Sequence, residues 1–96
     1  MISKYAIVVA TKEQVSSELA GEAVILNLKN GMYYGLDPVG ARIWTLIQQP
    51  RSVAALFEVI LAEYDVDPGR CERDVLALLR DLAAAELIEV SDVAAA

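Results

Sequence analysis

The first third of the chain alternates apolar and polar residues with a period of two, which is typical of β-strands. The stretches concerned are residues 15–20, 23–29 and 32–36, and they are separated by Gly21-Glu22 and Asn30-Gly31. An Asn-Gly pair closes a tight hairpin because both residues tolerate a positive φ. The pattern therefore predicts a three-stranded antiparallel sheet in which residues 32–36 form an edge strand.

The alternation also assigns faces to these strands. Val15 and Leu19 lie on one face of the first strand, which is predicted to pack on a core while the other face meets water. In the second strand Val24, Leu26 and Leu28 share one face.

From residue 38 onward the apolar residues recur with the period of an α-helix. Asp37-Pro38 predicts the start of a helix, because an aspartate N-cap accepts a backbone N–H and proline suits the first helical position. Pro50 cannot continue this helix, which is predicted over residues 38–48. Ser52 can cap a second helix, whose apolar residues all fall at helical spacing: Val53, Leu56, Phe57, Ile60, Leu61 and Tyr64.

A second Asp-Pro pair, Asp67-Pro68, predicts a third helix over residues 68–85. Its apolar surface is wider than one stripe, because two lines of apolar residues run side by side along the helix. The first line is Cys71, Val75, Leu78 and Leu82, and the second is Leu76, Leu79 and Ala83. A helix with so wide an apolar face is expected to contact two neighbours.

The two ends of the chain complete the predicted fold. Residues 1–12 are predicted to form an N-terminal arm or strand, residues 87–90 a strand or apolar anchor, and residues 91–96 a frayed tail. The elements together predict a single α+β domain over residues 1–96. It is expected to be a winged helix-turn-helix, with a three-stranded antiparallel N-terminal sheet, three helices and a short C-terminal strand. Architecture alone assigns no function.

The composition narrows the class of protein. The chain has 96 residues, enough for one domain, and its hydrophobic content of 56% with a mean hydropathy of +0.42 allows a generous core or an apolar surface for a partner. No window approaches the roughly 18–20 apolar residues of a membrane span, so no membrane partner is expected. The single cysteine and the lack of a signal-peptide core predict a cytoplasmic protein.

The charge and the residue types present exclude further classes of protein. Eight basic and fourteen acidic residues give a net charge of -6, which argues against a surface that neutralises phosphates. Arg70, Arg73 and Arg80 lie where a DNA-reading helix places its contacts, but four carboxylates on the same segment outnumber them. We therefore expect no nucleic-acid partner. The chain also has no histidine, calcium loop or P-loop, so no metal and no cofactor are expected.

Cys71 is the candidate for thiol chemistry. It is predicted in the first turn of the third helix between Arg70 and Arg73, where the helix dipole and two cations would lower the pKa of its thiol. The alternative is a small buried helix residue, which the lack of a histidine base favours. We therefore expect no catalytic residue and no enzymatic activity.

The predicted edge strand offers a different function, because it carries Tyr33 and Tyr34 on opposite faces. An edge strand has unpaired backbone N–H and C=O groups. An extended peptide can add to them as one more strand, while its side chains enter pockets beside a neighbouring helix. Such a site needs an exposed edge and a half-apolar helix next to it, and the sequence predicts both.

Five segments in fixed order carry a resemblance to a known family: residues 24–44, 50–56, 64–68, 74–75 and 78–82. They resemble the PqqD-like family of precursor-peptide recognition proteins over about residues 20–90. The resemblance implies a winged helix-turn-helix domain that binds the leader segment of a ribosomally synthesised precursor peptide. In that family the leader adds to the third strand of the sheet and lies against the third helix.

The resemblance places a peptide-binding site on two elements. The candidate residues are Met32, Tyr33, Tyr34, Gly35 and Leu36 of the edge strand and Arg73, Asp74, Val75, Leu78, Leu79, Arg80, Asp81 and Leu82 of the third helix. The strand would pair with the leader, the tyrosines would wall the site, the apolar helix residues would form its floor, and the charged residues would fix the register. Which leucines face the groove and which the core is left open.

Within the family, a free-standing acidic member of this size is most similar to the leader-binding subunit of lasso-peptide biosynthesis. That subunit works beside a separate leader peptidase and a cyclase or other modifying enzyme. One alternative is the precursor-peptide carrier for a radical-SAM enzyme in pyrroloquinoline quinone synthesis. An alternative from another class is a winged-helix transcriptional regulator.

The chain departs from the family pattern at two positions. Asp37 stands where asparagine is common, and Glu86 stands where a glycine often precedes the closing Leu-Ile. Because glycine is the usual residue after a helix end, we expect the third helix to end less sharply here.

Overall fold

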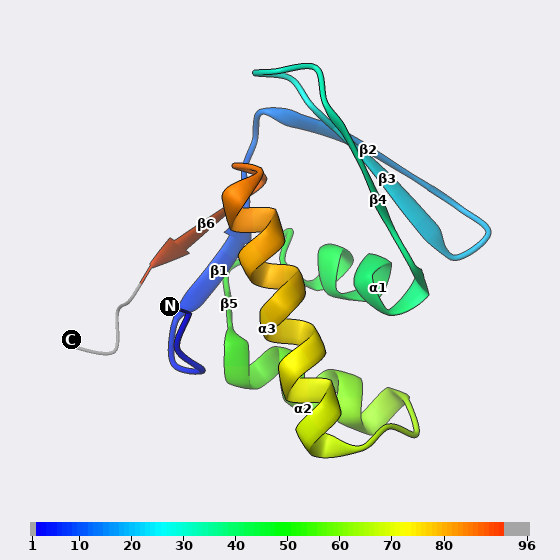
Figure 1. Ribbon diagram of the computed structural model, residues 1–96, viewed down its shortest axis with the longest axis vertical. Helices are drawn as coiled ribbons and strands as arrows, with labels where there is room; N and C mark the ends of the chain where they lie inside the picture. Colours follow the sequence, from blue (N-terminus) through cyan, green and yellow to red (C-terminus); the bar gives the residue numbers. More distant parts are fainter. Residues whose placement is uncertain (1, 92–96) are drawn as a thin grey trace.

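The computed structural model describes residues 2–91, which form two three-stranded antiparallel sheets and three α-helices (Figure 1). The elements in chain order are β1 (Ile7–Ala10), β2 (Gln14–Leu19), β3 (Glu22–Asn27), β4 (Tyr33–Leu36), α1 (Pro38–Leu46), β5 (Arg51–Ser52), α2 (Val53–Glu63), α3 (Pro68–Ala84) and β6 (Ile88–Ser91). The predicted α+β fold is confirmed, and the winged helix-turn-helix label stays a prediction. None of the helices in the described residues is long and apolar enough to cross a membrane.

The predicted helix starts are confirmed by their caps. The Asp37 carboxylate accepts the Gly40 N–H at 2.8 Å, the Ser52 hydroxyl accepts the Ala55 N–H at 3.1 Å, and the Asp67 carboxylate accepts the Arg70 N–H at 3.0 Å. Each of these bonds satisfies a backbone donor that has no partner within its helix. The helices end one or two residues earlier than predicted.

The predicted meander is also present, with strand order β2-β3-β4. Ala23 of β3 lies opposite Leu36 of β4, and Leu26 lies opposite Tyr33. Gly31 has a φ of 71° in the turn between these strands, which is the backbone conformation that a glycine permits there. The strand β4 therefore lies at an edge of this sheet, as predicted.

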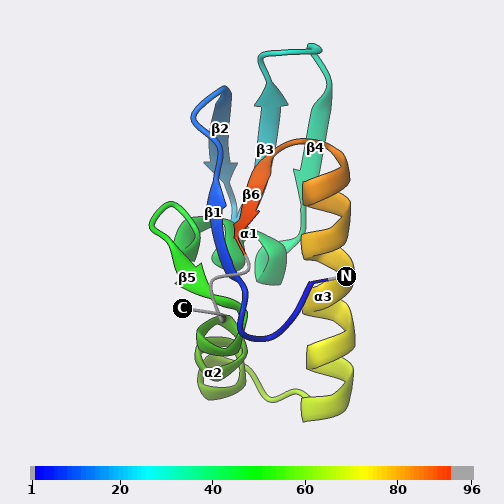
Figure 2. The same cartoon turned by 90° about the vertical axis from the view of Figure 1, so that its left-hand side faces the viewer.

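A second sheet, ordered β5-β1-β6, was not predicted. Residues 7–10 of the expected N-terminal arm form β1, which pairs with β6 and with the two-residue strand β5 (Figure 2). Ser91 was predicted to begin a frayed tail, but it is the last residue of β6 and lies opposite Ile7. The rest of that predicted tail, residues 92–96, lies outside the described residues.

The apolar side chains of the meander face outward more than the alternation predicted. Val15 and Leu19 are 57% and 81% exposed, so the prediction that their face packs on the core is wrong. The buried face of β3 instead carries Ala23, Ile25 and Asn27. Apart from Asn27, residues 23–28 are all apolar, so both faces of β3 carry apolar side chains. Packing against α1 therefore decides which face is covered.

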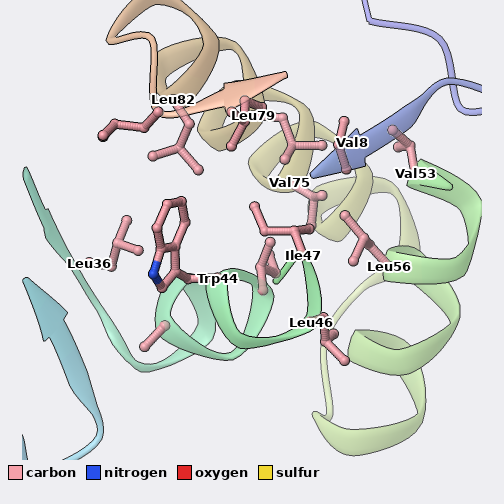
Figure 3. Packing of buried hydrophobic residues seen from close by; sticks show 14 of the residues in the cluster. Val8, Leu36, Trp44, Leu46, Ile47, Val53, Leu56, Val75, Leu79 and Leu82 are labelled. Carbon is pink, nitrogen blue, oxygen red and sulfur yellow. The ribbon is translucent and has the colours of Figure 1, made fainter. Parts of the chain in front are cut away.

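The hydrophobic core joins both sheets to the helices. Trp44 of α1 is 2% exposed and points toward Leu82 of α3, with Leu36 of β4 beside it (Figure 3). Leu79 and Leu82 are fully buried in the same cluster. This packing holds β4 and α3 at fixed positions relative to α1.

Asn27 ties the meander directly to the end of α3. It is the buried polar residue of the core, at 2% exposure. Its side-chain Nδ2 donates to the Ala85 carbonyl at 2.8 Å, and its Oδ1 accepts the Lys29 N–H at 2.9 Å. A buried amide needs such partners, so the pair of bonds favours one position of the sheet against α3.

The end of α3 contradicts the expectation of a gradual stop. Glu86 adopts a φ of 60°, its N–H donates to the Ala83 carbonyl at 3.0 Å, and the Leu87 N–H donates to the Leu82 carbonyl at 2.9 Å. The bond from Leu87 to Leu82 is that of a Schellman motif, which ordinarily has glycine in the left-handed position. The helix therefore ends sharply even with glutamate there.

We expect the substitution Glu86→Gly to raise the free energy of unfolding by about 1 kcal/mol, because a left-handed conformation costs an L-residue roughly 1–2 kcal/mol that glycine avoids. Denaturant titration measures this directly. The matched control is Glu58→Gly within α2, where glycine should lower stability by about 1 kcal/mol. A loss of stability in the Glu86→Gly protein would show that the glutamate side chain stabilises the fold by more than its left-handed backbone conformation destabilises it.

Candidate functional site

A groove of about 800 Å³ lies between β4 and α3, with the beginning of α1 beneath it. Figures 1 and 2 show that β4 and α3 run in opposite directions along the molecule. The lining residues are Tyr34, Gly35, Leu36, Asp37, Val39, Gly40, Ile43, Ile60, Asp65, Val66, Asp67, Arg70, Cys71, Asp74, Val75, Leu78 and Asp81. All three helices and the edge strand therefore contribute to one site.

The floor of the groove is apolar and its rim is polar. Ile43, Ile60 and Val75 are at most 2% exposed, while Val39 and Leu78 are partly buried against the same core. The aspartates that line the groove are exposed. An apolar floor with a few polar groups at the rim is the usual form of a binding site.

Gly40 allows the start of α1 to approach the end of β4. A Cβ added at Gly40 would lie 3.2 Å from the Asp37 carboxylate and 3.4 Å from the Leu36 side chain. Gly40 is itself buried in the first turn of α1. This contact fixes the end of the edge strand at the mouth of the groove.

The register of the meander identifies the free backbone groups of β4. The Asn27 N–H donates to the Met32 carbonyl at 2.9 Å, so these two residues form a hydrogen-bonded pair. Hydrogen-bonded pairs alternate along an antiparallel ladder, which makes Ile25 with Tyr34 the next one. The N–H and C=O groups of Tyr33 and Gly35 therefore point away from β3, toward the free edge.

The structure brings together seven of the predicted site residues in the groove: Tyr34, Gly35, Leu36, Asp74, Val75, Leu78 and Asp81. Met32 and Tyr33 are 65% and 71% exposed and do not line it. Leu79 and Leu82 face the core, which leaves Leu78 as the leucine of α3 in the groove. Their roles in binding stay predictions.

The predicted arginines also lie outside the groove lining. Arg73 and Arg80 are exposed on α3, and the Arg80 Nε donates to the Leu76 carbonyl at 3.3 Å within the same helix. Arg70, which was not predicted as a site residue, lines the groove instead. The basic side of the site is therefore smaller than the sequence indicated.

Other lining residues were missed, and all but Cys71 of α3 come from α1 and its N-cap, from α2 and from the segment before α3. They are Asp37, Val39, Gly40, Ile43, Ile60, Asp65, Val66, Asp67 and Cys71. Two of them had a usable signal in the sequence. Asp37 and Asp67 both precede proline at a helix start, and the structure brings these two starts to the same groove.

Tyr34 forms the wall of the groove together with a carboxylate. Burial raises the pKa of its hydroxyl, and the adjacent Asp81 carboxylate raises that pKa further. The phenol is therefore protonated at neutral pH and can donate its hydrogen bond to the Asp81 carboxylate.

Cys71 is a small buried helix residue, the alternative that the sequence favoured, and the pKa of its thiol is not lowered. Burial raises the pKa of the thiol, and the carboxylates of Asp74 and Glu72 raise it further. The side chain is 5% exposed. The desolvation of the thiolate and the two neighbouring carboxylates outweigh the helix dipole and the arginines.

We expect iodoacetamide to modify Cys71 of the folded protein far more slowly than a free cysteine at neutral pH, because the reactive thiolate is the disfavoured form. Mass spectrometry of the alkylated protein measures the rate. The same protein unfolded in guanidinium is the control and should react at the rate of an ordinary thiol. Equal rates in the two states would contradict the raised pKa.

Known proteins are similar to this chain in sequence and in fold. The family described as coenzyme PQQ synthesis protein D matches residues 22–88. The structure of TbiB1 in complex with the TbiA(beta) leader peptide is 41% identical, with a TM-score of 0.78 over 84% of this chain and 94% of that one. Lasso peptide synthetase B1 complexed with its leader peptide shows the same fold at 23% identity, with a TM-score of 0.74 over 85% of this chain and 96% of that one. No curated protein matches the chain.

The family match spans most of the chain and includes β3, β4 and all three helices, which together build the groove. The resemblance noted in the sequence is thereby confirmed at the level of the family. This chain belongs to the PqqD family, coenzyme PQQ synthesis protein D.

Proposed function

We propose that this protein binds the leader segment of a ribosomally synthesised precursor peptide and presents it to processing enzymes of the lasso-peptide type. The leader pairs as an extra strand with the free edge of β4 and places its apolar side chains in the groove against α3. TbiB1, the 41% identical relative, forms a complex with a leader peptide, which supports a ligand of this class.

One observation carries the proposal, namely that the free edge and the apolar groove lie side by side. The backbone groups of Tyr33 and Gly35 point to the edge, and Tyr34, Leu36 and Leu78 line the adjoining groove. Backbone pairing provides affinity that is independent of sequence, and pockets for alternate side chains provide selectivity. An edge strand beside a groove supplies both parts.

The proposed role is non-catalytic. The thiol of Cys71 is buried with a raised pKa, and the chain has no histidine. A recognition protein needs only to hold the leader in an extended form. The chemistry then belongs to a separate leader peptidase and to a cyclase or other modifying enzyme.

Binding of the leader tests the proposal. The probe is a fluorescein-labelled synthetic leader, taken from the precursor peptide encoded beside this protein's gene, and the readout is fluorescence polarisation. We expect saturable binding of the leader and none of a scrambled peptide of the same composition. If the folded protein shows no affinity for the leader at high micromolar concentration, the proposal fails.

A second candidate function follows from the family name, since the matching family takes part in coenzyme PQQ synthesis. In that case the protein carries its precursor peptide to a radical-SAM enzyme. The two candidates predict different partners for the same groove. A pull-down of the leader-bound protein with each purified enzyme separates them, because only the true partner should be retained.

A further inference from the structure

The groove is strongly acidic. Five carboxylates line it and a single guanidinium offsets them: Asp37, Asp65, Asp67, Asp74 and Asp81 against Arg70. This is an excess of four negative charges, while the net charge of the whole chain is -6. Most of the protein's excess charge is therefore gathered around one site, where a charged ligand would meet it.

The carboxylates are only weakly compensated by the protein itself. The Arg70 guanidinium lies 3.7 Å from Asp74, and both side chains are more than 70% exposed, so the ion pair is weak. Asp37 and Asp67 accept one backbone N–H each at their helix caps. Asp65 and Asp81 form no ion pair with any residue from 2 to 91.

These carboxylates are distributed unevenly along the groove. Asp81 lies beside Tyr34, near the beginning of β4. The other four lie at the opposite end: Asp37 directly follows β4, Asp65 and Asp67 precede α3, and Asp74 is in its second turn. Because β4 and α3 run in opposite directions, the acidic end of the groove is the end where β4 stops (Figure 1).

A metal ion does not explain this arrangement. Within residues 2–91, no three acidic or other metal-binding side chains come close enough together to hold one. The carboxylates are instead spread along a groove of about 800 Å³ whose floor is apolar. Spread charges above an apolar floor are complementary to an extended peptide that carries several cationic side chains.

We propose that the groove selects leader peptides with lysine or arginine residues at the N-terminal end of the segment that pairs with β4. The inference rests on the proposed leader binding. The strands of the meander are all antiparallel, and antiparallel addition to β4 places the N-terminal end of the incoming strand where β4 ends. The cationic side chains then lie above Asp37, Asp65, Asp67 and Asp74.

The test compares two pairs of substitutions that change the net charge equally. Asp65→Asn with Asp74→Asn removes two carboxylates from the groove, while Glu22→Gln with Glu58→Gln removes two exposed carboxylates outside it. We expect the groove variant to bind the labelled leader about fivefold more weakly, since each exposed pair contributes a small factor. The control variant should bind like the wild type.

The leader peptide is varied in the same experiment. Glutamine is substituted for each lysine or arginine at the N-terminal end of the paired segment, and we expect these peptides to lose affinity for the wild type but not for the groove variant. Such non-additivity identifies side chains that interact directly. Affinity for the wild type should also fall as salt rises from about 0.1 M to about 1 M, where the screening length shortens from about 10 to about 3 Å.

The outcomes separate this inference from the proposed function. One outcome is that the wild type binds the leader with an affinity that is unchanged by salt, by the groove substitutions and by the peptide substitutions. In that case selection by charge is wrong and leader binding stands. If the control pair weakens binding as much as the groove pair, only the overall charge matters and the inference is also wrong. If the wild type does not bind the leader at all, the proposed function itself fails.

Discussion

We expect Gly35→Pro to weaken leader binding by about fivefold to about a hundredfold, because one buried acceptor of the leader left unpaired costs roughly 1–3 kcal/mol. The fold should be unchanged. The N–H of Gly35 points to the free edge and makes no bond to β3, so its loss removes no bond from the sheet. Fluorescence polarisation measures binding, and thermal unfolding followed by circular dichroism checks the fold.

Position 35 has room for a side chain. Gly35 is not among the positive-φ glycines, and a Cβ added there would meet no atom within 4 Å. Proline is also tolerated on an edge strand when its missing N–H would have faced away from the sheet. The substitution therefore alters the edge and leaves the core untouched.

The matched control is Gly35→Ala. Alanine fills the same open space and retains the N–H, so this variant should bind the leader like the wild type. If the proline variant binds as tightly as the alanine variant, the leader does not pair with β4, and the site must be sought elsewhere on the molecule.

The sequence predicted this edge strand because its signals are local. Asn30-Gly31 and Asp37-Pro38 bound β4, and each acts within a few residues of the chain. The helix starts follow from the same kind of signal, since a cap involves residues three positions apart. Elements with local signals were placed to within one or two residues.

A strand was predicted near each end of the chain as one alternative, but the pairing of these strands into a second sheet had no local signal. Its strands β1 and β6 lie near the two ends of the chain and pair with each other, and β5 has only two residues. Pairing between distant segments depends on the whole packed structure, which one alternating stretch does not reveal. For the same reason the alternation in β3 left open whether Ile25 or Val24 faces the core.

The groove was predictable in part. The wide apolar surface of α3 indicated two contacts, and the structure has both, since Leu79 and Leu82 face the core and Leu78 lines the groove. The two predicted lines do not separate these contacts, because Leu78 and Leu82 lie on the same line. The sequence does not tell which part of so wide an apolar surface faces the core and which faces the groove. Adjacent residues are about 100° apart around a helix, so both parts belong to one continuous apolar surface. The contributions of α1 and α2, including Ile43 and Ile60, depend on tertiary packing alone.

The second large effect is expected for Leu78→Asp, which should abolish measurable leader binding while the protein stays folded. Leu78 lines the groove and is only partly buried, so an aspartate there can remain hydrated in the free protein. A bound leader would have to cover that carboxylate and would lose the apolar contact, worth about 1.5–3 kcal/mol for a fully buried leucine. The same change at Leu79, which is fully buried, should instead unfold the protein.

Leu61→Asp is the control for this substitution. Leu61 lies on α2, is 39% exposed and does not line the groove, so the same change of side chain should leave binding intact. Isothermal titration calorimetry with the unlabelled leader compares the two variants, and denaturant unfolding confirms that both are folded. If Leu78→Asp and Leu61→Asp bind the leader equally well, the leader does not enter the groove. Loss of binding in Leu78→Asp alone would show that the peptide enters the groove against α3, and together with a loss in Gly35→Pro it would place the peptide between β4 and α3.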